Sequence, residues 1–199
     1  MIQDARPGDL VLTRGHFRWW PPKYIVRSVL YREIRRFQKK RYERMRWAFP
    51  ALGIPRDYDY LPTHVYVVMG SRLLFEFTEP RARFISVEDS GIEDKGYTLH
   101  RWRHYGALPT TQELADRCHK EFEGDEYDIG DLLDFELSGW LKILEKVRLF
   151  GDRADKLKVC STGAFSVLAP WGVFAEFAPD PAYIANVKRD FKMVADRRK

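Results

Sequence analysis

The residue best suited to do chemistry in this sequence is Cys160, in the stretch KVCSTGAFSVLAP. A thiol attacks as its thiolate, and an ordinary thiol with a pKa of about 8.5 is mostly protonated at neutral pH. A helix N-terminus and a neighbouring imidazolium both favour the thiolate. The small residues after Cys160 lead into an apolar run, which predicts that a helix begins here. The alternative is a buried structural cysteine, since cysteine is one of the most frequently buried residue types.

A histidine and a carboxylate in the centre of the chain can complete a catalytic set with this cysteine. His64 begins the predicted strand THVYVVMG, and Glu76 lies between apolar residues in LLFEFTE. The two strands are expected to form a hairpin that turns near Gly70 and Ser71. This register places Glu76 opposite Val65 and therefore next to His64. The functional interpretation is a nucleophile, a base and a residue that orients the base. The alternative is a polar pair on a surface strand.

The other candidate residues have weaker patterns. His100 and His104 have the i, i+4 spacing of a metal pair on a helix, but their segment is typical of a strand running into a loop, which favours a solvated edge. On a predicted helix, Cys118 falls in the apolar stripe and His119 beside it, so we expect a core cysteine and a rim histidine. Two residues lack an expected partner: His16, in a loop, and Glu79, the rival of Glu76.

The elements that must position these residues predict an α+β fold. Five segments are rich in β-branched or aromatic residues and are expected to form a small, mainly antiparallel sheet: LVLTR, THVYVVMG, RLLFEFTE, ARFISVE and GYTLHRWR. The first has the alternation of a half-buried strand. Helices are expected over TTQELADRCHKEF, with Thr110 or Thr111 as N-cap, from Cys160 onward, and around PAYIANVKRDF, where a short helix closes the chain.

Positive charge is concentrated in residues 18–47, which carry eleven Arg and Lys against two Glu. Residues 23–46 are predicted to form a basic amphipathic helix, with four apolar residues on one face: Val26, Leu30, Ile34 and Phe37. Such a helix can contact an anionic membrane surface, with Trp19 and Trp20 as an interfacial anchor. Nucleic acid is a weaker expectation, because no base-reading motif accompanies the charge. The alternative is a solvated helix packed against the domain.

Length and composition limit the remaining classes of protein. The 199 residues, of which 45% are hydrophobic, suit a single domain. No segment has the pattern of a signal peptide or of a membrane span, so a cytoplasmic protein, peripheral to a membrane at most, is expected. Two cysteines exclude a disulfide scaffold, and no metal site or cofactor is expected.

Several segments, in this order, resemble the circularly permuted branch of the NlpC-type papain-like superfamily: PGDLVLTRG, THVYVVMG, LLFEFTEPRARFISVED, EYDIGDLLDF, and KVCSTGAFSVL followed by APDPAYI. This branch includes YiiX-like bacterial proteins and is related to the lecithin:retinol acyltransferase group. In it the histidine strand comes first and the cysteine helix lies near the C-terminus, which is the order found here. The resemblance covers most of residues 6–106 and 125–186 and leaves out the basic insertion at about 17–60.

The resemblance implies a permuted papain-like fold and a thiol hydrolase. Cys160 would be the nucleophile, His64 the general base and Glu76 the third member. The implied substrates are peptides, including those of peptidoglycan type, and acyl esters or amides of lipids. A catalytically inactive member that binds lipid, membrane or peptide is the alternative.

Three further residues are expected to line the site: Tyr127, in EYD, Tyr66 and Ser161. For Tyr127 the alternative is an ordinary amphipathic tyrosine. The sequence departs from the family pattern at Tyr66 and Phe77, where a small residue is usual. These departures bear on the substrate rather than on the chemistry.

Overall fold

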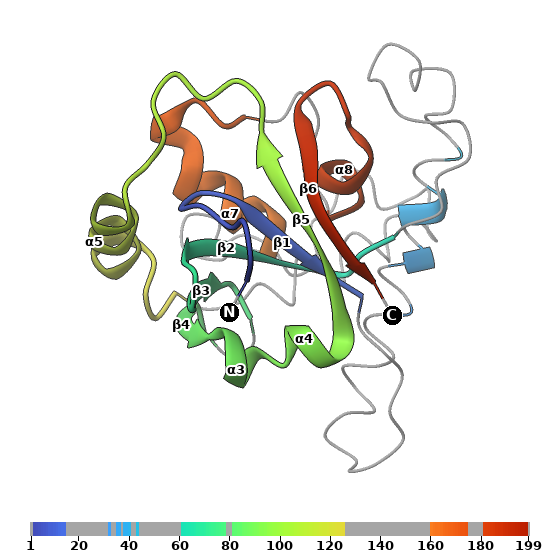
Figure 1. Ribbon diagram of the computed structural model, residues 1–199, viewed down its shortest axis with the longest axis horizontal. Coiled ribbons are helices and arrows are strands. Elements are labelled where there is room, and N and C mark those ends of the chain that lie inside the picture. Colours follow the sequence, from blue (N-terminus) through green and yellow to red (C-terminus); the bar gives the residue numbers. More distant parts are fainter. Residues whose placement is uncertain are drawn as a thin grey trace, which may run out of the picture.

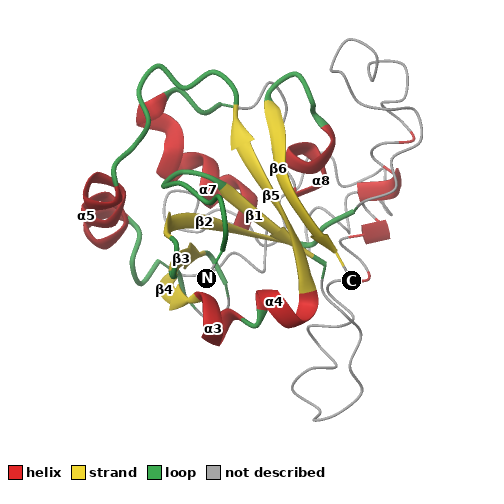
Figure 2. Ribbon diagram, in the orientation of Figure 1, coloured by secondary structure: helices red, strands yellow, loops and turns green. Residues whose placement is uncertain are grey.

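The computed structural model describes residues 2–14, 32, 35, 36, 38–40, 43, 61–78, 81–125, 160–174 and 181–198. These residues form an α+β fold around a six-stranded antiparallel sheet with the order β4-β3-β2-β1-β5-β6 (Figures 1 and 2). Its strands are β1 (Leu10–Thr13), β2 (His64–Gly70), β3 (Leu73–Glu76), β4 (Arg83–Ser86), β5 (Gly96–Trp102) and β6 (Phe191–Arg198). The helices are α3 (Val87–Ser90), α4 (Ile92–Lys95), α5 (Thr111–Glu121), α7 (Cys160–Leu168), the 3-10 turn η1 (Ala169–Trp171) and α8 (Pro181–Asn186).

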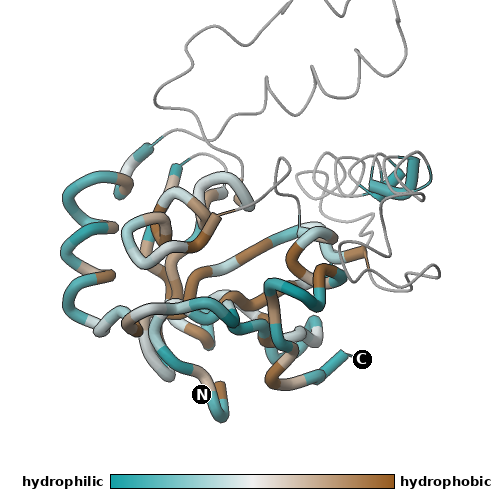
Figure 3. The backbone as a smooth tube through the Cα atoms, turned by 90° about the horizontal axis from the view of Figure 1, so that it is seen from above, coloured by the Kyte–Doolittle hydropathy of each residue, from teal (hydrophilic) through white to brown (hydrophobic). Residues whose placement is uncertain are grey.

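Both faces of the sheet are covered, because alternate residues of the central strands pack into two separate apolar clusters. Leu10, Leu12 and Val65 belong to the larger cluster, which includes residues of α5, α7 and α8. Val11 and Tyr66 belong to the smaller cluster with residues of α3 and α4. The prediction of a half-buried first strand is therefore wrong, since every residue of β1 is buried. In Figure 3 the outward turns of α5, at the left, are hydrophilic.

Helix α5 forms where the sequence predicts it, and its N-terminus is fixed by a capping box. The Thr110 hydroxyl accepts a hydrogen bond from the N–H of Glu113 at 3.2 Å, and the Glu113 carboxylate accepts one from the N–H of Thr110 at 2.9 Å. Leu114 and Cys118 face the core, as expected from their spacing.

The hairpin of β2 and β3 has a different register from the predicted one. Glu76 lies opposite Tyr66, not Val65, because the turn is at residues 71 and 72, one place later than predicted, and because β2 contains an irregularity between Val68 and Gly70. Gly70 pairs with Leu73 and Val68 with Leu74, so β2 uses two residues where β3 uses one. Such a β-bulge moves the following residues of a strand to the opposite face. The bulge therefore puts Glu76 on the same face as His64, which a regular hairpin would not do.

The C-terminal part of the chain also differs from its prediction. The helix expected around PAYIANVKRDF ends at Asn186, and Phe191 begins β6, which pairs with β5 as the outermost strand. A strand, not a helix, thus closes the described chain. Five of its eight residues are exposed and four are charged, so it lacks the regular apolar alternation that predicts a strand.

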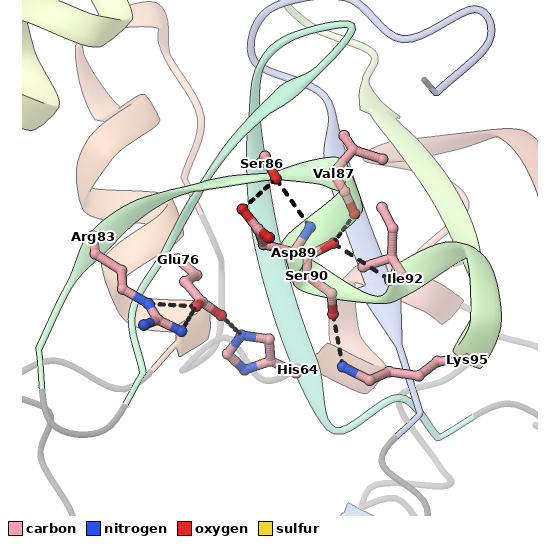
Figure 4. A network of polar contacts seen from close by, with 9 residues as sticks. All are labelled: His64, Glu76, Arg83, Ser86, Val87, Asp89, Ser90, Ile92 and Lys95. Carbon is pink, nitrogen blue, oxygen red and sulfur yellow. Dashed lines mark hydrogen bonds and ion pairs between the residues drawn. The ribbon is translucent and has the colours of Figure 1, made fainter.

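The segment after β4 forms two short helices that the sequence analysis missed. Ser86 caps α3 by accepting a hydrogen bond from the N–H of Asp89 at 2.9 Å. Gly91 joins α3 to α4 with a φ of 62°, a conformation that favours glycine. Lys95 donates to the carbonyl of Ser90 at 2.8 Å and ties the second helix to the first (Figure 4).

The PGD stretch is structural. Arg101 on β5 donates to both carboxylate oxygens of Asp9, at 2.8 and 2.7 Å, and Asp9 is 1% exposed. The hydroxyl of Tyr105 donates to the carbonyl of Gly8, whose φ is 87°. These bonds fix the entry into β1 and explain why aspartate and glycine are needed there without a catalytic role.

The basic insertion is described at only a few positions. Residues 32, 35, 36, 38–40 and 43 are helical, in agreement with the predicted basic helix. The buried side chain of Gln38 donates to the carbonyl of Pro62 at 2.9 Å. The described part of the insertion is thus attached to the chain two residues before His64. The remaining predictions for this region, including the apolar face and the anchor at Trp19 and Trp20, lie outside the described residues.

Candidate active site

The structure brings together the three residues that the sequence analysis selected as a catalytic set. Nε2 of His64 lies 3.1 Å from Oε2 of Glu76, and both side chains are buried (Figure 4). Cys160 is close enough to the imidazole for their interaction to raise the pKa of His64. Since Nε2 is engaged by Glu76, Nδ1 is the ring nitrogen left for the thiol. His64 and Glu76 are therefore not a polar pair on the surface, which was the alternative.

The electrostatic state of His64 follows from its two partners. Burial lowers the pKa of His64, but its hydrogen bonds with Cys160 and Glu76 and the charges of these groups raise it to about 9. Burial likewise raises the pKa of Glu76, but the hydrogen bonds and charges of His64 and Arg83 outweigh it and leave this pKa lowered. At neutral pH the pair is therefore a buried carboxylate beside an imidazolium, and an imidazolium favours the thiolate of a neighbouring cysteine.

Helix α7 positions Cys160 at its first residue, as the sequence predicts. The helix packs against β2 and also meets Phe77, the residue after β3. A Cβ atom at Gly163 would lie within 2.6 Å of three carbons of the Phe77 ring, so only glycine fits at this position. The bulky Phe77 is thus accommodated by a glycine in the facing helix. Cys160 itself is 5% exposed. A buried structural cysteine, the alternative to a nucleophile, predicts the same burial.

Arg83 is a site residue that the sequence analysis missed. Its Nε and Nη2 atoms each lie 2.9 Å from Oε1 of Glu76. Arg83 and Glu76 are directly opposite in the β3–β4 pair. Pairing the predicted strands RLLFEFTE and ARFISVE would have suggested an arginine partner for Glu76. The loop between them is not a tight turn, however, so its length does not determine the register.

The residues expected to line the site have different positions. Tyr66 is buried, and its ring meets that of His64 edge to face with 4.5 Å between centroids. It therefore packs against the histidine and restricts its orientation. Ser161 is 2% exposed and lies next to Cys160 in the first turn of α7. Tyr127, like Glu79 and His16, lies outside the described residues.

The other histidines are separate from this site. The prediction of a solvated edge is wrong for His100, because β5 lies between β1 and β6 and His100 is 2% exposed. It is correct for His104, whose side chain is exposed beside Asp190. His119 is exposed and pairs with Glu123, as expected for a rim residue.

The buried His100 predicts a loss of stability in acid. Burial lowers its pKa to about 4, although the nearby Asp196 opposes this and Arg198 adds to it. Its Nε2 is 3.0 Å from the Thr98 hydroxyl. Between pH 6.5 and 4 the unfolded chain binds a proton at this residue that the folded chain does not, so the free energy of unfolding falls as the pH falls through this window.

We expect His100→Gln to remove about 2 to 3 kcal/mol of the stability difference between pH 7 and pH 4.5. Urea unfolding of both proteins at the two pH values measures it. The raised pKa of His64 does not confuse the result, since its stabilising contribution is complete below pH 6.5 and is lost only as the pH rises through about 9. Equal acid losses in both proteins would contradict the prediction.

Comparisons with known proteins found no match, so the functional argument rests on the geometry of the site. No family model matches the chain, and no curated protein and no solved structure matches it either. Within the described ranges, no cluster of three or more His, Cys, Asp or Glu is arranged to hold a metal ion. In the same part of the chain, no helix has the length and apolar character needed to cross a membrane.

Proposed function

We propose that the protein is a thiol hydrolase that cleaves an amide or ester bond with Cys160, His64 and Glu76. The observation that carries this proposal is the position of the His64 ring, which pairs with the buried carboxylate of Glu76 at 3.1 Å and interacts with the side chain of Cys160. A nucleophile, a base and an orienting group in one chain of hydrogen bonds are the general requirement for covalent catalysis of acyl transfer.

The reaction would proceed in two steps. The thiolate of Cys160 attacks the substrate carbonyl carbon, and the N–H of Cys160 at the start of α7 is the donor we assign to the developing oxyanion. The imidazolium of His64 then gives its proton to the leaving amine or alcohol, which leaves a thioester on Cys160. In the second step the neutral imidazole takes a proton from water as the water attacks the thioester carbonyl. The carbon–sulfur bond then breaks, which releases the carboxylic acid and restores the Cys160 thiolate beside the His64 imidazolium. Glu76 orients the ring and stabilises its protonated form.

The fold proposed for this activity is the permuted papain-like fold. It is supported by the order of the elements, in which the histidine strand β2 precedes the cysteine helix α7. The substrates proposed with it are peptides, including peptidoglycan-type peptides, and acyl esters or amides of lipids. The basic insertion attached before His64 is the part of the chain that we propose contacts an anionic membrane surface.

The test of this proposal is the selective reactivity of one of two buried cysteines. Burial raises the pKa of Cys118 to about 12, so this thiol is expected to be inert in the folded protein. A thiol-directed probe at pH 7 should label Cys160 and not Cys118, as read by mass spectrometry of the two peptides. Cys160→Ala should remove the label, whereas Cys118→Ala should not change it.

The alternative of a catalytically inactive binding protein predicts a different outcome. In that case neither cysteine is labelled near neutral pH, and a panel of thioester, ester and amide substrates is not hydrolysed. Labelling of both cysteines to the same extent would show that the reagent detects unfolding instead. Only selective labelling of Cys160, together with hydrolysis that Cys160→Ala abolishes, supports the enzyme.

A further inference from the structure

The described residues contain a second cation next to the proposed catalytic set. The guanidinium of Arg83 makes two contacts of 2.9 Å with one oxygen of Glu76, while the other oxygen faces His64 at 3.1 Å (Figure 4). The arginine and the histidine approach the carboxylate from different sides. Each carboxylate oxygen therefore has its own cationic partner.

The burial of these groups makes the second cation important. The Glu76 side chain is 5% exposed, and a carboxylate in such a place tends to become protonated unless cations or hydrogen bonds stabilise its charge. The guanidinium supplies a second positive charge, so the charge of Glu76 does not depend on the imidazolium of His64 alone.

The geometry also fixes the direction of the carboxylate. The Nε–H of Arg83 donates a hydrogen bond to Oε1, and Nη2 of the same planar guanidinium forms an ion pair with that oxygen, which together restrict the carboxylate more than a point charge does. With Oε1 held by Arg83, Oε2 is directed at the ring of His64. The backbone supports this arrangement, because Arg83 and Glu76 are a directly opposed cross-strand pair.

We propose that Arg83 is a positioning residue of the active site, which keeps Glu76 ionised and directed at His64 when the pH falls. This inference rests on the proposed hydrolase, in which Glu76 supports His64. Arg83 acts through Glu76 and is not assigned a contact with the substrate. Its side chain is 55% exposed on the edge strand β4, so its replacement leaves the core intact.

The first test is the pH profile of Cys160 alkylation by iodoacetamide between pH 5 and pH 8. In Arg83→Ala we expect the rate at pH 5 to fall about tenfold below that of the wild type, with less than about a twofold change at pH 8. Arg83→Lys keeps the charge without the paired N–H donors and should give an intermediate profile. A merely structural role would lower the rate by the same factor at every pH, and this result, or an unchanged profile, would overturn the proposal.

Arg189→Ala is the matched control, since Arg189 is partly exposed and also pairs with a carboxylate that is 9% exposed, that of Asp190. Its profile should equal that of the wild type. A displaced profile in this variant would count against a role specific to Arg83.

The second test does not depend on a reactive thiol. In a Cys160→Ala background, NMR signals of the His64 ring are followed as a function of pH, with and without Arg83→Ala. Loss of the arginine should let Glu76 take up its proton at a higher pH, which the ring signals report as a displaced acid transition. Identical curves would refute the positioning role. If this transition is displaced but Cys160 of the wild-type protein is never labelled by the thiol probe, the positioning role of Arg83 is supported and the hydrolase is refuted.

Discussion

Replacement of His64 by alanine is expected to slow the alkylation of Cys160 at pH 6 by about 100-fold or more. In the wild type the imidazole is protonated throughout the neutral range, because its pKa is about 9, and the resulting cation stabilises the thiolate. Without the imidazole, the thiol must ionise alone at the start of α7. The rate in the variant should therefore fall steeply between pH 8 and pH 6, whereas that of the wild type falls much less. Hydrolysis of any substrate found for the protein should decrease at least as much.

The structure provides an internal control for this experiment. Cys118 is fully buried and distant in sequence from the site, so its alkylation reports unfolding of the chain. His64→Gln is the companion variant, because its amide can still donate to Glu76 but cannot carry a positive charge. Slow alkylation in both variants with Cys118 unlabelled would attribute the effect to the charge of the imidazolium. Fast alkylation of Cys160 in either folded variant would contradict the proposed role of His64.

Replacement of Gly163 by alanine is expected to reverse the usual effect of this substitution in a helix. At a solvent-exposed helical position, alanine is more favourable than glycine by about 1 kcal/mol. In α7 the new methyl group would lie within 2.6 Å of three carbons of the Phe77 ring, which is itself buried in the core. Overpacking of this kind costs about 1 to 3 kcal/mol. Since three contacts are this short, the cost should be in the upper part of this range, and denaturant unfolding should show a net destabilisation of about 1 to 2 kcal/mol after the gain from alanine is subtracted. The displaced helix should also reduce Cys160 labelling.

Two variants isolate the contact between the helix and the strand. Gly106→Ala is the matched control, since a Cβ atom there would have no neighbour within 4 Å. Its free energy of unfolding should change by less than about 0.5 kcal/mol. Phe77→Leu combined with Gly163→Ala should be less destabilised than the sum of the two single variants, because the smaller side chain makes room for the methyl group. Strict additivity, or a Gly163→Ala protein as stable as the wild type, would refute the packing argument.

Local sequence signals predicted the elements that position the site. The start of α7 at Cys160 and the strand that begins at His64 follow from short-range patterns and are found where predicted. The N-cap of α5 is Thr110, one of the two predicted residues. These features depend on apolar periodicity and on capping residues, and both can be read within one short segment of the sequence. The α+β class follows from the same patterns.

The features that the sequence could not provide depend on contacts between segments. Strand β6 has mostly exposed residues and is stabilised by pairing with β5 more than by an apolar pattern of its own. The burial of His100 follows from that pairing, because the sixth strand turns the predicted edge into an interior position. Arg83 was missed for a similar reason, since its partner is determined by a hairpin whose loop length does not define the register. In each case the decisive neighbour comes from another strand.

The irregularity in β2 means that the residue beside His64 depends on whether β2 carries one extra residue before its turn. If β2 and β3 paired without the extra residue, the position opposite Tyr66 would belong to Phe77, and His64 would have an aromatic ring as its neighbour instead of a carboxylate. A protein with a regular hairpin would need its acidic residue one place later in the sequence. The interval between the histidine and the glutamate therefore identifies this pair only together with the turn that joins their strands. Insertions and deletions, which surface turns usually tolerate, would here exchange one chemical function for another.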